Sequence, residues 1–366
     1  MPGPILVLNA GSSSIKCALF GAHFREMLRV EATGIGARGA VKVSGAAPRA
    51  LSLPDNAAAL RAVADALAAE GAALDRLALV AHRVVHGGDE FTAPARITDK
   101  VRAGIEACIP LASLHNPHHL AAIDWIAQAA PSLPQVASFD TAFHATVPEV
   151  ARRYALPDLP ATRGLRRYGF HGNSYAALTR ALPEMTGAPL PARLLALHLG
   201  NGASLCAIRE GKSVATTMGY SPLGGLTMGT RVGVIDPGAV LELVSRVGLP
   251  QADQILSAQS GLLGLSGFSG DMRELAAGDT PRAAFARDHF AYWAARQAGS
   301  MFAAMGGCDA IAFTGGIGEN DADIRTRITD LLRWAGDLPV HVVPAAEEAH
   351  IAMQAAQLTG IDTADA

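Results

Sequence analysis

The sequence predicts an α/β protein of two similar domains, each a mixed β-sheet flanked by helices. With 366 residues, half of them hydrophobic and 17% charged, the chain is long enough to bury two separate cores. Apolar runs of strand length alternate with amphipathic segments of helix length. One pattern also occurs three times: an apolar run followed by a turn rich in Gly, Asn and Ser, at residues 5–16, 194–204 and 311–320.

The first half is expected to hold a strand pair, a helix, a buried strand and a second helix, at residues 5–8 with 15–20, 55–70, 77–85 and 117–130. Asp55 suits the N-cap of the first helix, and Gly71 suits its end. Asn116 and Pro131 bound the second helix. The Gly-rich turn after the first strand makes the strand pair a hairpin.

The second half repeats this plan, so we expect a weak internal repeat. Its elements are a strand, Gly turn and strand, a long helix, two further strands and a last helix, at residues 194–208, 281–305, 311–313, 340–343 and from about 345. Glu210 and Gly211 mark the next hairpin turn. The last helix is expected to pack back on the first domain. The predicted domains are therefore residues 1–141 with 349–366, and residues 142–348.

Composition excludes several classes of function. A net charge of −3 gives no general attraction to nucleic acid or to an anionic membrane, and no stretch approaches the roughly 18 apolar residues of a membrane span. The cysteines are far apart and form no CxxC pair, which favours reduced core thiols: Cys17, Cys108, Cys206 and Cys308. We therefore expect a cytoplasmic protein that binds neither nucleic acid nor membrane.

Two familiar patterns are rejected. Residues 34–39 match the dinucleotide fingerprint GxGxxG, but the residues that follow are extended in character, and no helix is there to receive a pyrophosphate. A histidine group suggests zinc, but no Cys or carboxylate cluster accompanies it, so we expect it to pack at a helix start or to line a pocket: His115, His118 and His119.

The Gly-rich turns and nearby charges favour a phosphate site. Glycine lets successive backbone N–H groups approach a ligand, and Ser and Asn add donors. Arg83 and Arg231 lie beside such turns, where a guanidinium can grip phosphoryl or carboxylate oxygens. Asp140 and Glu347 are candidate magnesium partners, and His171 is a candidate donor to a phosphoryl group. The alternative for each charged residue alone is an ordinary surface ion pair.

Taken together, these segments resemble the acetokinase family, within the superfamily of sugar kinases, actin and heat-shock chaperone ATPases. The matching stretches are residues 9–16, 82–88, 114–118, 139–144, 167–172, 198–202, 219–231, 313–320 and 347–348. The resemblance implies two ribonuclease-H-like domains facing an interdomain nucleotide cleft. The chain departs from the family pattern at Val232 and Val234, where the family usually has Ser and Asp, and at Tyr175, where it has His.

The resemblance also implies a site. Mg²⁺, with Mn²⁺ as a substitute, would be held by Asn9 and Glu347. ATP or ADP would be held by Lys16, His198, Leu199, Gly200, Asn201, Gly202, Asp271, Met272, Arg273, Gly316, Ile317, Gly318, Glu319 and Asn320. A short carboxylate would be held by Arg83 between Val85, Leu114, Phe170 and Pro222. The catalytic residues would be Arg83, His171, Arg231 and Asp140, the last an acid/base residue in the family. Since a carboxylate acceptor is already ionised at pH 7, we expect Asp140 to position magnesium instead.

The activity implied is reversible transfer of the ATP γ-phosphoryl group to acetate, which gives acetyl phosphate and ADP, by a homodimer. Such a transfer needs alignment and charge neutralisation, which arginine, histidine and magnesium provide without a nucleophilic Ser or Cys. Two alternatives stay open at this point. One is a propionate or butyrate kinase of the same family, and the other is an ATPase switch of the same superfamily.

Overall fold

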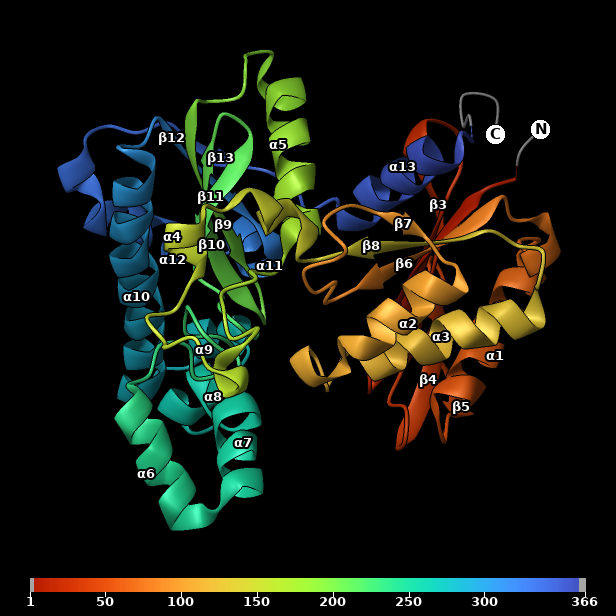
Figure 1. Ribbon diagram of the computed structural model, residues 1–366, viewed down its shortest axis with the longest axis horizontal. Coiled ribbons are helices and arrows are strands. Elements are labelled where there is room, and N and C mark those ends of the chain that lie inside the picture. Colours follow the sequence, from red (N-terminus) through yellow and green to blue (C-terminus); the bar gives the residue numbers. More distant parts are fainter. Residues whose placement is uncertain (1–2, 362–366) are drawn as a thin grey trace. The chain divides into compact units, whose positions relative to one another are not determined.

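The computed structural model describes residues 3–361, and the chain forms two compact units (Figure 1). Unit 1 runs to Ala142 and resumes at Ala346, and unit 2 is Phe143–Ala345. Residues 142 and 346–348, which are predicted to lie in the second domain, belong to unit 1. Residues 346–348 do so because helix α13 starts at Glu347 and packs on the sheet of that unit.

Unit 1 is built on an eight-stranded sheet of order β5-β4-β3-β2-β1-β6-β8-β7. The strands are β1 Ile5–Ala10, β2 Ser14–Phe20, β3 Glu26–Thr33, β4 Arg38–Val43, β5 Arg49–Ser52, β6 Leu79–Val84, β7 Ala95–Arg96 and β8 Gln135–Phe139. Strands β1 to β3 are antiparallel, as the predicted hairpin requires, whereas β6 and β8 run parallel to β1. The rejected fingerprint at 34–39 is indeed followed by extended chain, in β4.

Helices cover both faces of this sheet: α1 Asn56–Ala69, α2 Asp99–Ala107, α3 Asn116–Ala129 and α13 Glu347–Thr359. Alternation along β1 divides the core, because successive side chains point to opposite faces. Leu6 and Leu8 join the core beneath α1 and α3, and Ile5 and Val7 pack with α13. The Asp55 side chain caps α1 by accepting from the Ala58 N–H at 2.7 Å, as predicted.

Unit 2 contains a five-stranded sheet of order β11-β10-β9-β12-β13. Its strands are β9 Arg193–Leu199, β10 Ala203–Arg209, β11 Lys212–Thr216, β12 Ala310–Thr314 and β13 Val340–Val342. Strands β9 to β11 are antiparallel, and β12 and β13 run parallel to β9. Glu210 and Gly211, with φ of 51° and 76°, form the predicted hairpin turn.

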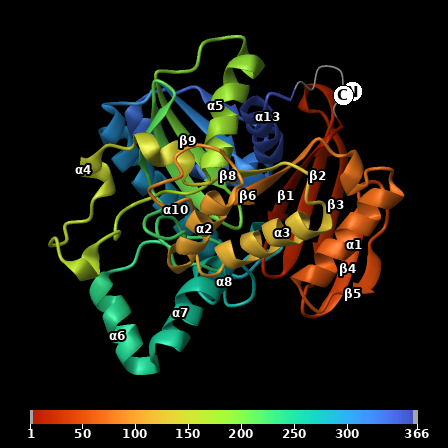
Figure 2. The same ribbon diagram turned by 45° about the vertical axis from the view of Figure 1, so that its right-hand side comes forward.

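The helices of unit 2 are α4 Glu149–Arg152, α5 Gly172–Thr186, α6 Pro237–Val247, α7 Leu249–Ala258, α8 Gly261–Ser266, α9 Met272–Ala277, α10 Pro281–Met305, α11 Gly315–Asn320 and α12 Ala322–Leu331. Residues of α5 share a core cluster with β9 and β10, and α10 also packs on these strands. The predicted long helix has the bounds of α10, capped by Thr280 and ended by Gly306 at φ 74°. Helices α6 and α7 pair as a helical hairpin (Figure 2).

The predicted internal repeat is confirmed by the two sheets. The set β3-β2-β1-β6-β8 has the same order and directions as β11-β10-β9-β12-β13. The third Gly-rich turn was expected to be a loop and is a helix, since α11 begins directly after β12. Cys17, Cys108 and Cys206 are buried free thiols, and Cys308 is half-buried. Among residues 3–361, no helix has the length and apolar character of a membrane span.

Candidate functional site

In unit 1, four predicted residues lie where the parallel strands end. Asn9 is near the end of β1 and pairs across the hairpin with Lys16. Arg83 lies in β6, and Asp140 directly follows β8. Glu347 is the first residue of α13. Carboxyl ends of parallel strands share one edge of a sheet, so β-strand order itself brings these side chains into one region.

Arg83 and Asp140 form a bidentate salt bridge. The Arg83 Nε lies 3.0 Å from Asp140 Oδ1, and Nη2 lies 2.7 Å from Oδ2. Burial opposes the charge of Arg83, but Asp140 and Glu347 outweigh it and raise the pKa of the guanidinium. Asp140 is 2% exposed, so its carboxylate serves first to orient Arg83. The outer nitrogen Nη1 donates to no residue within the described part of the chain.

Glu347 is a carboxylate in a disfavoured electrostatic position. Its Oε2 lies 4.0 Å from Arg83 Nε, and its side chain is 17% exposed. Burial raises the pKa of Glu347 to about 7, with further increases from Asp140 and Glu348 that Arg83 only partly offsets. A nearby cation would restore the charged form.

The remaining predicted residues of unit 1 differ in exposure. Val85 is buried, whereas Leu114 is 58% exposed. The described residues contain no group of three or more His, Cys, Asp or Glu that could hold a metal. His118 Nδ1 contacts Asn56 Nδ2 at 2.8 Å, and His119 is buried. His118 and His119 therefore lie packed at the start of α3, where the sequence predicts them.

In unit 2, the turn between β9 and β10 lies at the centre of the predicted residues. A Cβ built on Gly202 would lie 3.3 Å from His171 Nε2 and 3.6 Å from Arg231 Nη1. A Cβ on Gly200 would lie 3.9 Å from both His198 Nε2 and the Gly316 N–H nitrogen. Two imidazoles, one guanidinium and the start of α11 therefore surround this turn.

Serine hydroxyls hold both imidazoles at their inner nitrogens. His171 Nδ1 lies 2.9 Å from Ser204 Oγ, and His198 Nδ1 lies 2.8 Å from Ser174 Oγ. The rings are tilted by 30° with centroids 4.2 Å apart. The sequence did not indicate Ser174 and Ser204 as site residues, although Ser204 lies in the second Gly-rich segment, because contacts between α5 and the strands β9 and β10 appear only in the folded chain.

Arg231 is hydrogen-bonded to the loop of residues 219–231, of which it is the last residue. Its Nη1 donates to the Pro222 carbonyl at 3.3 Å, so these two predicted residues are in contact. Phe170 is fully buried, and its carbonyl accepts from His144 Nε2 at 2.9 Å. This contact fixes the chain directly before His171.

Several residues predicted to bind ATP have side chains that are buried or already hydrogen-bonded within the protein. Leu199 and Met272 are buried in the core. In α11, the Glu319 carboxylate accepts from Gly315 and Ala345 N–H groups, and the Asn320 amide donates to the Gly316 carbonyl at 2.9 Å. Asp271 and Arg273 pair with each other at 2.6 Å near the start of α9.

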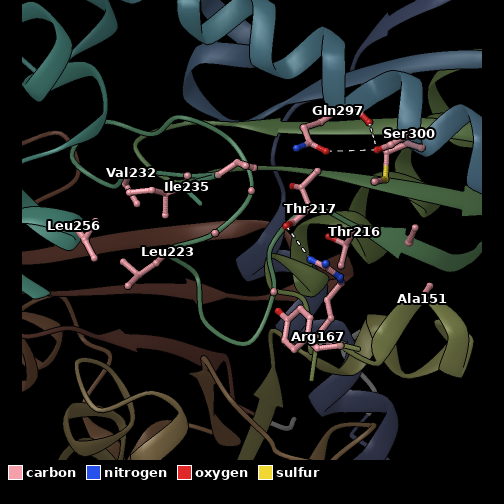
Figure 3. Close-up of a pocket in the computed structure, with 18 of the residues that line it drawn as sticks. Ala151, Arg167, Thr216, Thr217, Leu223, Val232, Ile235, Leu256, Gln297 and Ser300 are labelled. Atoms are coloured by element: carbon pink, nitrogen blue, oxygen red, sulfur yellow. Dashed lines mark hydrogen bonds between the residues drawn. The ribbon is translucent and has the colours of Figure 1, made fainter. Parts of the chain in front are cut away.

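A cavity of about 580 Å³ in unit 2 contains none of the predicted site residues (Figure 3). Its apolar wall includes Leu223, Val232, Val234 and Leu256. Arg167 lies in the opposite wall and donates to the Thr217 carbonyl at 3.2 Å (Figure 3). Val232 and Val234, the two valines that depart from the family pattern, line this cavity. The candidate site is therefore identified by its converging polar groups and not by the size of a cavity.

A model of the acetokinase family matches residues 4–352. The chain belongs to the acetokinase family. The acetate kinase of Nitrobacter hamburgensis is 42% identical, over 97% of this chain and 96% of that protein. This acetokinase also resembles two solved structures. The acetate kinase of Porphyromonas gingivalis has 33% identity and a TM-score of 0.87, covering 98% and 99% of the two chains.

The second structure is a propionate kinase from Francisella tularensis, with 35% identity, a TM-score of 0.90 and coverage of 97% and 99%. The predicted family and fold class are confirmed, and with them the enzyme class of this acetokinase, a phosphotransferase with a carboxyl acceptor.

Proposed function

We propose that this acetokinase transfers the γ-phosphoryl group of ATP reversibly to acetate, giving acetyl phosphate and ADP. The observation that carries the proposal is the convergence of His171 and Arg231 on the Gly200–Gly202 turn. Backbone N–H groups and donors of this kind suit phosphate oxygens. Phosphoryl transfer depends on positioning and charge neutralisation, so no covalent intermediate is required.

We assign the acid to Arg83. Asp140 occupies Nε and Nη2, which fixes the plane of the guanidinium and turns Nη1 toward a substrate carboxylate. The buried Val85 supplies apolar surface nearby, and Leu114, Phe170 and Pro222 are the further walls that we propose. Asp140 is then a positioning residue for Arg83, in place of the magnesium role expected from the sequence, because both of its carboxylate oxygens accept from Arg83.

Magnesium fits the residues of unit 1. We propose Glu347 and Asn9 as its partners, because Glu347 carries a charge that burial disfavours. Few protein ligands are needed, since Mg²⁺ usually keeps several waters and binds substrate phosphates. When bound, the ion would neutralise charge on the β- and γ-phosphates.

Propionate is the second candidate acid, because the similar Francisella tularensis structure is a propionate kinase. One methylene changes pocket binding by only about 1–3 kcal/mol, so the two acids will differ in degree. We further propose that the protein is a homodimer. We also propose that it is cytoplasmic, where free thiols such as those of its cysteines stay reduced.

The test is hydroxylamine trapping of acyl phosphate in the presence of ATP, Mg²⁺ and acetate, propionate or butyrate. We expect an acyl hydroxamate whose yield is highest with acetate and is abolished by EDTA. ATP hydrolysis without dependence on any added acid would support the superfamily ATPase switch and overturn the proposal. A higher kcat/KM for propionate would replace acetate as the acceptor and leave the kinase chemistry in place.

A further inference from the structure

Two buried hydroxyl groups lead from the core of unit 2 to His171. Tyr175 lies in α5, is fully buried, and places its hydroxyl 2.5 Å from Ser204 Oγ. Ser204 lies in β10, is equally buried, and its Oγ is 2.9 Å from His171 Nδ1. We propose that this Tyr175–Ser204 relay sets the tautomer and orientation of His171, so that its Nε2 donates a hydrogen bond to the phosphoryl group.

The backbone of His171 shows that its position is imposed by its surroundings. His171 has φ 59° and ψ 22°, a left-handed conformation that a non-glycine residue rarely adopts. Its carbonyl accepts from the Tyr175 N–H at 3.1 Å. Tyr175 therefore restrains His171 twice, through the first turn of α5 and through Ser204.

The proposed relay has one direction of donation. The Tyr175 O–H donates to Ser204 Oγ, which leaves the single Ser204 proton to donate to His171 Nδ1. In a neutral imidazole, a nitrogen that accepts leaves the other nitrogen as the donor. Nε2 then carries the proton, and it is the atom beside Gly202. Phosphate oxygens accept such a bond.

The neighbouring ring favours a neutral donor. The His198 ring lies against the His171 ring with centroids 4.2 Å apart, and it has a serine at its own Nδ1. Two imidazolium ions at this separation would repel each other, and Arg231 adds a third positive charge near Gly202. A relay that presents Nε2–H without protonating the ring avoids this repulsion.

Tyr175 stands where the family pattern given in the sequence analysis has His. Its phenol O–H can donate the bond to Ser204 that the relay requires. The catalytic purpose of the relay rests on the proposed function. Its effect on the tautomer does not.

The direct test is the imidazole ¹⁵N NMR spectrum of the full chain labelled in histidine, with the His171 signals assigned from a His171→Gln variant. We expect the Nε2–H tautomer in the native protein and a loss of this preference in Tyr175→Phe and Ser204→Ala. Ser174→Ala should disturb the His198 signals and leave the His171 tautomer in place. Tyr292→Phe, on the exposed side of α10, is the matched control.

Kinetics provides the second readout. Tyr175→Phe should lower kcat roughly tenfold with little change in the KM for ATP, as loss of one hydrogen bond in the transition state predicts. Tyr175→His should recover part of the loss at pH 8, where the new ring is neutral. If Tyr175→Phe does not fold, Ser204→Ala replaces it.

A folded variant that lacks either hydroxyl but keeps the Nε2–H tautomer would overturn the proposal. An altered tautomer with unchanged kcat would overturn its catalytic purpose alone. If neither the native protein nor any variant forms acyl phosphate, the proposed function is wrong. The NMR spectra still test whether Tyr175 and Ser204 set the tautomer of His171.

Discussion

At the residue scale, each candidate side chain of this acetokinase is oriented by a hydrogen bond to a neighbouring group. Arg83 is oriented by Asp140, His171 by Ser204, and Arg231 by the Pro222 carbonyl. The sequence indicated the two arginines because each lies beside a Gly-rich turn, and it indicated His171 as a candidate donor to a phosphoryl group. Two of the groups that orient them were not recognisable, since a buried hydroxyl or carbonyl looks ordinary until the tertiary structure brings it near a charge.

Replacing Arg231 by Ala should lower kcat by roughly 10²–10⁴, or about 3–5 kcal/mol of barrier, because a charge that stabilises the transferring phosphoryl group is lost. The measurement is the hydroxamate rate with acetate and Mg²⁺-ATP. Arg246→Ala removes an exposed arginine from α6 and serves as the control. Near-native turnover in the Arg231 variant would contradict the assigned role.

His82 makes stability depend on pH. Burial lowers the pKa of His82 to about 4, and the hydrogen bond that its Nε2 donates to Gln135 Oε1 at 2.7 Å only partly opposes this. The unfolded chain has the ordinary value of about 6.5 and binds more protons between these two pKa values, so unfolding becomes easier as pH falls through this window. His82 alone should remove about 2 kcal/mol between pH 7 and pH 5.

The double variant His82→Leu with Gln135→Leu should lose this part of the pH dependence. Replacing both partners by apolar groups leaves no orphaned polar atom, so stability at pH 7 should change little. Urea unfolding at pH 7 and pH 5 measures the difference, with His23→Gln as a control outside the sheet. Equal losses in the native protein and the double variant would rule out His82 as the cause.

At the scale of elements, helix α13 links the end of the chain to the site. Its first residue is Glu347, and Ile351, Ala352 and Ala355 pack against the first sheet. The sequence predicted this helix and its return to the first domain from the apolar residues after residue 345. Its start next to Arg83 required the assembled sheet, because the two are far apart in sequence.

Ile351→Ala should therefore destabilise the protein by about 2–5 kcal/mol, the usual cost of a cavity in a well-packed core. Leu358→Ala, in the same helix but 41% exposed, should cost less than about 1 kcal/mol. The free energy of unfolding in urea measures both. Similar costs for the two variants would show that α13 does not depend on this packing.

For the whole molecule, one repeated sequence pattern underlies a five-strand order that the two sheets share. Each unit places a Gly-rich turn after its first strand, and each brings polar residues to the carboxyl ends of parallel strands. The repeat explains why candidate residues occur in two groups along the chain. Family membership, shown by a match over residues 4–352, accounts for both groups together.

The proposed homodimer is a prediction about the whole molecule. Unit 2 exposes large apolar side chains, among them Val150, Leu241 and Leu249, which a subunit contact would cover. Sedimentation velocity should give twice the 37.8 kDa mass of one chain at micromolar concentration. A single-chain mass across the concentration range would contradict the prediction.

The sequence by itself determined the α/β class, the repeat, the main helices and the glycine turns, because periodicity, capping residues and glycine act locally. It did not reveal α11 as a helix, since its run of glycines indicates a loop unless the preceding strand and Glu319 hold the backbone. Only the tertiary structure decided that Asp140 grips Arg83 and that Tyr175 reaches His171 through Ser204. These contacts join residues on different strands and helices, and burial gives them their strength by excluding the water that would otherwise compete.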